Sequence, residues 1–166
     1  MTEKKAISNF RTNTENREFA TERIFDAPRE LAWKAWTEPK HVAQWWGPKG
    51  WTLPVCKMDF RPGGVWHYCM QGPEGEESWG KAFYREIVEP ERIVYTDTFS
   101  DEEGNAVEGM PEMLITVEFT EHQGKTTLTT HAKFASIAVL ESILDMGMVE
   151  GLTGTWDRLE EYLVKG

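Results

Sequence analysis

The apolar residues between Ala138 and Val164 recur in steps of four and three. They are Leu140, Leu144, Met148, Leu152, Trp156, Leu159 and Leu163. Because an α-helix has about 3.6 residues per turn, this spacing places them along one side of a single helix. Charged residues fall on the other side, so one face is expected to meet water and the other a partner surface. At about 1.5 Å per residue the helix would run roughly 40 Å, a length that a broad sheet could cover.

Three glycines lie inside this predicted helix, at positions 147, 151 and 154. Each costs up to about 1 kcal/mol relative to alanine in a helix interior. Three explanations stay open: close contact between helix and sheet, room for a ligand beside Met148 and Trp156, or an interruption of the helix around Gly147.

The length of 166 residues predicts one domain, and eight tryptophans supply ample material for a core. Residues 1–17 are polar and lack periodicity, so they are expected to form a flexible N-terminal arm before a single domain over 18–166. The net charge of -10 disfavours binding to nucleic acids and anionic membranes. Without a leader or a long apolar span, the chain is expected to be cytoplasmic, with no membrane insertion. The oligomeric state, including a homodimer, stays open.

Strand and helix signals alternate at the start of this domain. A strand pattern over 18–27 ends at Pro28, which suits the first position of a helix. Pro39 opens a second short helix that contains Trp45 and Trp46 and closes at Gly47. The two tryptophans could cap a ligand entrance, but wedging the helix onto the sheet is the favoured interpretation.

From Trp51 to Phe134 the sequence reads as six strands separated by turns. In the first hairpin a three-residue loop over 62–64 is favoured, because it places Phe60 opposite Trp66 and Met58 opposite Tyr68 on one apolar face. This register puts Cys56 and Cys69 on opposite faces and predicts no disulfide between them.

In the last hairpin, a turn at Gln123-Gly124 pairs Phe119 with Leu128 and again gathers one apolar face. The facing of the strands over 79–88 and 93–99 stays open. The acidic stretch 100–111 is predicted to be an exposed loop and a mobile rim. The order of strand, two short helices, six strands and a long helix predicts an α+β fold, with helices on one face of an antiparallel sheet.

Residues able to carry catalysis or bind a metal are scattered. The four histidines are His41, His67, His122 and His131, and none belongs to a zinc-binding pattern. No metal, cofactor or catalytic residue is therefore assigned. Asp59 and Arg61 are predicted to form a solvent-exposed ion pair, and Cys69 with His67 is predicted to be structural on a wet face.

Several motifs in this order carry a resemblance to a known superfamily. They are Phe25-Asp26-Ala27-Pro28, Trp33 with Trp36, Trp45-Trp46-Gly47-Pro48, Asp59-Phe60-Arg61-Pro62-Gly63-Gly64, Glu89-Pro90-Glu91-Arg92-Ile93, and a terminal helix with Trp156 and Leu159. Together, over roughly residues 19–163, they resemble the START-like, helix-grip (SRPBCC) superfamily. Within it the chain is similar to the branch named after the C-terminal domain of the activator of heat-shock-protein-ninety ATPase.

The resemblance implies a curved seven-stranded antiparallel sheet wrapped around the C-terminal helix, with a hydrophobic cavity between them. Function in this superfamily follows the cavity. The first hypothesis is a non-catalytic binder of a small hydrophobic or aromatic molecule, lipid or polyketide-like in character. The expected ligand-binding residues are Met58, Phe60, Trp66, Tyr68, Met70, Tyr95, Ile115, Val117, Leu144, Met148, Leu152 and Trp156.

Two alternatives remain beside this hypothesis. One is a cyclase or hydrolase-type enzyme that uses a cavity acid or base such as Asp97 or Tyr95, which would need a perturbed pKa. The other is a chaperone-binding module of the stress response, suggested by the family name alone.

Overall fold

The computed structural model describes residues 9–13, 15–47, 49–108, 112–145 and 147–165. Eight antiparallel strands form one sheet in the order β1-β2-β8-β7-β6-β5-β4-β3. The strands are β1 (Asn9–Asn13), β2 (Glu18–Phe25), β3 (Thr52–Met58), β4 (Val65–Gln71), β5 (Glu77–Val88), β6 (Arg92–Phe99), β7 (Glu112–His122) and β8 (Lys125–Lys133). The helices are α1 (Arg29–Thr37), α2 (Pro39–Trp45), α3 (Ile137–Asp145) and α4 (Met148–Lys165).

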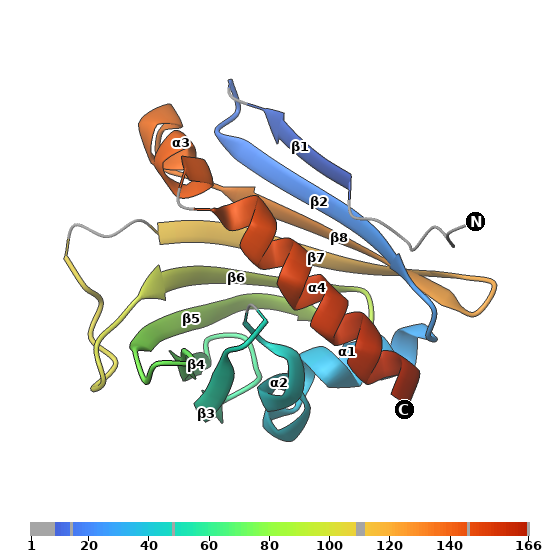
Figure 1. Ribbon diagram of the computed structural model, residues 1–166. Helices are drawn as coiled ribbons and strands as arrows, with labels where there is room; N and C mark the ends of the chain where they lie inside the picture. The colour runs from blue at the N-terminus through green and yellow to red at the C-terminus, as the bar shows by residue number, and fades with distance from the viewer. Residues whose placement is uncertain (1–8, 14, 48, 109–111, 146, 166) are drawn as a thin grey trace.

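The predicted α+β helix-grip architecture is confirmed. Figure 1 shows α4 lying diagonally across one face of the curved sheet, with α1 and α2 beside its C-terminal half. The sheet has one strand more than expected, because Asn9–Asn13, placed in the predicted flexible arm, form β1 and pair with β2. An edge strand is held by main-chain hydrogen bonds, which polar side chains do not reveal. Residues 1–8 of the predicted arm lie outside the described residues.

The predicted C-terminal helix is divided into α3 and α4. Gly147 lies between them with φ of +92°, a conformation that glycine adopts far more readily than other residues. Its backbone N–H donates to the carbonyl oxygen of Leu144 at 3.1 Å. The prediction of one unbroken helix is therefore wrong, and the interruption at Gly147 is the explanation that the structure bears out.

The first hairpin has the predicted faces but not the predicted register. Met58 lies opposite Trp66 and Cys56 opposite Tyr68, a shift of two residues from the prediction. A six-residue connection over 59–64 replaces the three-residue loop, because the Gly63 N–H bonds to the Tyr84 carbonyl on β5 at 2.8 Å. Since side chains alternate with period two, a shift of two residues preserves the faces. The two cysteines are free and face opposite sides, as predicted.

The last hairpin follows its prediction. Phe119 pairs with Leu128, and Gln123 and Gly124 both have positive φ at the turn, as a two-residue hairpin turn requires. The facing of β5 and β6, left open by the sequence, is now fixed: Tyr84 lies opposite Tyr95 on the inner side.

An aromatic cluster fills the space between the helices and the inner face of the sheet. Trp45 is fully buried, and its indole N–H donates to the Ala35 carbonyl at 2.9 Å, so it packs α2 against α1. Its ring lies 5.1 Å from that of Trp36 and 6.3 Å from that of Trp156 on α4. This contact brings α2 and α4 together over the sheet.

The outer face is covered where β4 and β5 run side by side. The His67 ring donates a hydrogen bond from Nε2 to the Asp101 carbonyl at 3.1 Å, and Lys81 donates to the Gly104 carbonyl at 2.8 Å. The loop after β6 thus lies on this face, although several of its residues are exposed as predicted. The prediction of a wet face is wrong for Cys69, which is 1% exposed. Residues 109–111 of the predicted rim lie outside the described residues.

The Asp59–Arg61 ion pair is exposed as predicted. Arg61 Nη2 lies 2.9 Å from an Asp59 carboxylate oxygen, and both side chains are more than half exposed. They sit in the connection over 59–64 and not on a strand, so solvent surrounds them on most sides.

Candidate functional site

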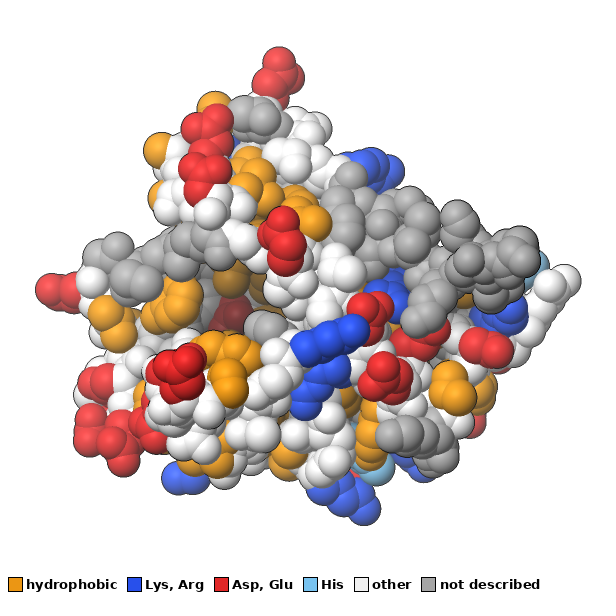
Figure 2. Space-filling model, viewed as in Figure 1, with side chains coloured by type: hydrophobic (Ala, Val, Ile, Leu, Met, Phe, Trp, Pro, Cys, Tyr) orange, Lys and Arg blue, Asp and Glu red, His pale blue; other side chains and the backbone are white. Residues whose placement is uncertain are grey.

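A cavity of about 380 Å³ lies between the inner face of the sheet and α4. Figure 2 shows the hollow in this face of the molecule, bordered mainly by apolar side chains, with an acidic group visible in its depth. Its walls come from the end of α2, from β4 to β7 and from α3 and α4. The hollow is therefore the space that the curved sheet leaves beside the helix.

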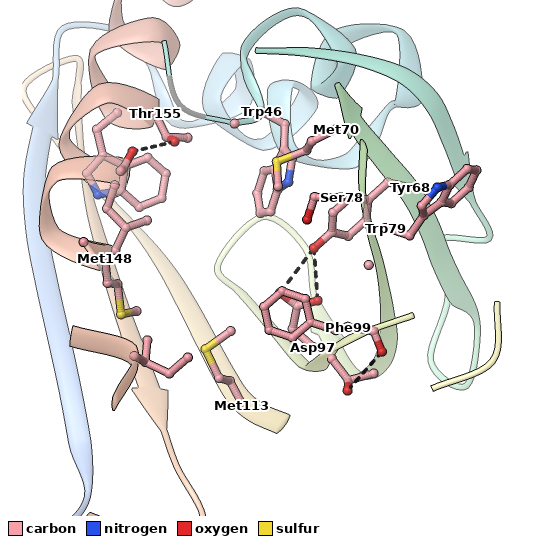
Figure 3. A pocket seen from close by; sticks show the side chains of 18 residues that line it. Trp46, Tyr68, Met70, Ser78, Trp79, Asp97, Phe99, Met113, Met148 and Thr155 are labelled. Atoms are coloured by element: carbon pink, nitrogen blue, oxygen red, sulfur yellow. Dashed lines mark hydrogen bonds between the residues drawn. The ribbon is translucent and has the colours of Figure 1, made fainter. Parts of the chain in front are cut away.

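Five of the twelve predicted ligand-binding residues line this cavity. They are Tyr68, Met70, Met148, Leu152 and Trp156. Figure 3 shows Tyr68 and Met70 on the sheet side and Met148 on the helix side of the space between them. These five residues stay the predicted ligand contacts.

The other seven predicted residues do not line the cavity. They are Met58, Phe60, Trp66, Tyr95, Ile115, Val117 and Leu144. Tyr95 and Val117, for example, are 3% and 0% exposed and belong to the packed core. Phe60 packs against Trp33 and Tyr84, with ring centroids 6.0 and 4.9 Å apart. The aromatic cluster fills this part of the inner face and leaves no room for a ligand.

Further residues line the cavity that were not among the predicted ligand contacts, although Trp46, Asp97 and the helix glycines were considered for other roles there. They are Trp46, Gly47, Ser78, Trp79, Gly80, Asp97, Thr98, Phe99, Met113, Ile143, Gly147, Gly151 and Thr155. Met113 carried a usable signal, because it lies on the apolar face of the last hairpin. The other β5 and β6 residues carried none, since the facing of both strands was open, and Asp97 was named only as a possible cavity acid or base. Gly147 and Gly151 at the wall agree with the explanation that glycines leave room for a ligand.

Asp97 is the one charged residue among the described residues that line the cavity. The Tyr68 hydroxyl donates to its carboxylate, with distances of 3.2 and 3.4 Å to the two oxygens (Figure 3). Burial raises the pKa of Asp97 to about 7, although hydrogen bonds from Tyr68 and from the Thr98 backbone act in the opposite direction. The cavity thus holds a carboxyl group that changes its charge near neutral pH.

Gly80 has no side chain, and this leaves room for the ring of Tyr68 on the neighbouring strand. A Cβ atom at position 80 would lie 2.4 Å from Tyr68 Cζ and 2.5 Å from its hydroxyl oxygen, far inside van der Waals contact. Burial, followed by the charges of Asp97 and Tyr95, raises the pKa of Tyr68 well above its usual value. The phenol therefore stays protonated and serves as a hydrogen-bond donor to Asp97.

Arg158 on α4 holds the end of α2 beside the cavity. Its guanidinium donates to the carbonyl oxygens of Gly47 at 2.9 Å, Trp46 at 3.3 Å and Gln44 at 3.2 Å. The ring of Trp46 in turn lies 5.9 Å from that of Tyr68. Trp46 therefore belongs to the cavity wall as well as to the aromatic cluster. Its contacts with Trp66 and Tyr68 place it on the sheet, which agrees with the wedging interpretation, and a role at a ligand entrance stays a prediction.

The described part of the chain contains no group of three or more His, Cys, Asp or Glu residues placed to hold a metal ion. None of the helices described is both long and apolar enough to cross a membrane.

Known proteins share this sequence pattern and fold. A crystal structure of a protein from Mycobacterium smegmatis is 30% identical, with a TM-score of 0.86 over 93% of this chain and 95% of that chain. A solution structure from Arthrobacter aurescens is 26% identical, with a TM-score of 0.89 over 95% and 92% of the two chains. A crystal structure from Nitrosomonas europaea is also 26% identical, with a TM-score of 0.80 over 90% and 96%. No curated protein matches the chain.

The family model that matches covers residues 26–164, which include the cavity and all four helices apart from the last residue of α4. Its start at Asp26 coincides with the first motif of the resemblance, and its end lies in the terminal helix. The chain therefore belongs to the family of Activator of Hsp90 ATPase homolog 1-like proteins.

Proposed function

We propose that the protein binds a small hydrophobic or aromatic molecule, lipid or polyketide-like in character, in the cavity between the sheet and α4. The observation that carries this proposal is the cavity itself, about 380 Å³ of space with mainly apolar walls. Ligand sites in proteins commonly have volumes from about 300 to 1,000 Å³. The fold of this family generally binds hydrophobic ligands, which agrees with the proposal.

The side chains of the wall suit such a ligand. Trp46 and Trp156 offer aromatic surfaces, and burial of apolar area contributes about 25 cal/mol per Å². Met113 and Met148 face the space from opposite sides (Figure 3). Because methionine is unbranched and polarisable, the two thioethers can adapt to ligands of different shape. Desolvation therefore supplies the affinity in this proposal.

The proposal is tested with N-phenyl-1-naphthylamine, an uncharged probe that fluoresces strongly in apolar surroundings. We expect a saturable rise in its emission when the full-length protein is added. Replacing Met148→Trp is expected to fill part of the cavity and weaken binding about tenfold or more, which corresponds to about 1.4 kcal/mol or more. Fluorescence titration at fixed probe concentration gives both affinities.

Val164→Trp is the matched control, because it adds the same side chain to α4 at a position that is 66% exposed. It is expected to leave the affinity for the probe unchanged. Emission that does not saturate, or equal affinities in the two tryptophan variants, would contradict binding in this cavity.

A second candidate function is a cyclase or hydrolase-type enzyme, and Asp97 is the observation that favours it. A carboxyl group with a pKa of about 7 inside an apolar cavity is suited to proton transfer at neutral pH. Tyr95, the other predicted acid or base, is buried in the core and does not line the cavity. Mass spectrometry of aromatic polyketide-like compounds after incubation with the protein tests this function. Compounds recovered unaltered with wild-type protein would argue for binding alone.

A chaperone-binding role stays a prediction of the resemblance. The family is named after an activator of a chaperone ATPase. The geometry described above concerns the cavity and supports ligand binding instead.

A further inference from the structure

We infer that the cavity selects apolar molecules that carry a basic amine, with the Asp97 carboxylate as the partner of the amine. This inference rests on the proposed binding function and names the class of ligand for the same site. It follows from the position of Asp97 in the wall, from its remaining hydrogen-bonding capacity and from the negative net charge of the chain.

Asp97 retains acceptor capacity toward the cavity. An ionised carboxylate accepts about four hydrogen bonds. The hydroxyl of Tyr68, at 3.2 and 3.4 Å, and the backbone N–H of Thr98 account for part of this capacity. The distances from Tyr68 are long for an O–H donor to a carboxylate. A ligand with a strong hydrogen-bond donor could supply the remaining hydrogen bonds that the Asp97 carboxylate can accept.

The other described residues of the wall provide no positive charge for this carboxylate. The side chains near Asp97 on the sheet include the phenols of Tyr68, Tyr84 and Tyr95 and the thioether of Met113. The opposite wall presents Met148 and Thr155. A buried charge without a partner is costly, whereas a charged partner with good hydrogen bonds offsets much of that cost. A protonated amine supplies both the positive charge and the donors.

The charge of the whole chain also favours a cation. The guanidinium of Arg158, on α4 beside Gly47, donates to the main-chain carbonyls of Gln44, Trp46 and Gly47. The net charge of the chain is -10, which attracts cations and repels anions at longer range.

The experiment compares three ligands that share one ring system and differ in one group: naphthylmethylamine, naphthylmethanol and naphthoic acid. Isothermal titration calorimetry on the full-length protein at about pH 8, where Asp97 is ionised, gives the three affinities. We expect the amine to bind about tenfold or more tighter than the alcohol, because a charge-assisted hydrogen bond is roughly twice as strong as a neutral one. The acid is expected to bind weakest.

Asp97→Asn keeps the shape of the side chain and removes its charge, so it is expected to abolish the preference for the amine over the alcohol. Glu150→Gln is the matched control at the opening, where solvent screens the charge, and is expected to change the preference less than about twofold. Equal binding of the three ligands to the wild-type protein would overturn the amine preference and leave the proposed function standing. Failure of all three ligands to bind would overturn both the amine preference and the proposed function.

Discussion

Replacing Asp157→Asn and Glu160→Gln together is expected to lower the free energy of unfolding by about 3–5 kcal/mol, the range measured when a buried ion pair loses one partner. Both carboxylates face Arg23, whose side chain is only 3% exposed. Arg23 Nη2 lies 2.8 Å from Asp157 Oδ1 and 2.5 Å from Glu160 Oε1. The double variant leaves a buried guanidinium without a negative partner.

The position of this ion pair gives it a structural role. Arg23 projects from β2 and the two carboxylates from α4, so the pair fixes the helix to the sheet on the side where β1 and β2 lie. Burial alone would raise the pKa of Asp157, but the hydrogen bonds and charges of Arg23 and Lys49 outweigh it and hold the pKa below its usual value. Folding therefore favours the ionised form of Asp157.

Asp59→Asn is the matched control, because it also removes the carboxylate partner of an arginine. Arg61 and Asp59 are 66% and 53% exposed, so this substitution is expected to cost less than about 1 kcal/mol. Urea unfolding followed by tryptophan fluorescence measures both variants. A double variant no less stable than Asp59→Asn would show that water or rearrangement compensates Arg23.

The sequence predicts the fold well where periodicity is strong. The pairing of Phe119 with Leu128 and the faces of the first hairpin follow from alternation and turn residues, and both are observed. Arg23 shows where this reasoning ends. The sequence of β2 does not reveal that Arg23 points inward, because its carboxylate partners lie 134 and 137 residues away in the sequence.

The cavity could be predicted only in part for a related reason. Residues such as Tyr68, Met148 and Trp156 were predicted because they face inward, but so do Tyr95 and Val117, which lie in the packed core. Facing follows from periodicity, whereas the boundary between core and cavity depends on how far the Trp36, Trp45 and Trp46 rings reach. That boundary is set by tertiary packing, which no local pattern encodes.

The stability of the wild-type protein is expected to fall as pH rises through neutrality, because of Asp97. Its pKa is raised from 3.8 to about 7 by burial, so between these values the folded protein holds a proton that the unfolded chain has released. Stability falls with pH wherever the folded state binds more protons. The contribution is complete below about pH 4 and is lost as pH rises through about 7. Between about pH 5 and pH 8 the loss amounts to about 3 kcal/mol, at about 1.4 kcal/mol per unit.

Comparison with Asp97→Asn isolates this effect from the other titrating groups. The titratable side chains near Asp97 include Tyr68 on β4, Tyr84 on β5 and Tyr95 on β6 itself. Burial raises the pKa values of these phenols above their usual range, so they stay neutral throughout. The stability of the Asp97→Asn variant relative to wild type is therefore expected to rise by about 3 kcal/mol from about pH 5 to pH 8, measured by urea unfolding at each pH.

A constant difference between the two proteins across this range would mean that solvent entering the cavity hydrates the carboxylate as bulk water does. Ionisation of Asp97 would then not lower the free energy of unfolding, and a cationic ligand would gain little affinity from pairing with the carboxylate. A rising difference would show that the empty protein is least stable under the conditions in which Asp97 is ionised. Functional sites commonly carry such a cost, because the group that weakens the empty fold is the one that a ligand satisfies.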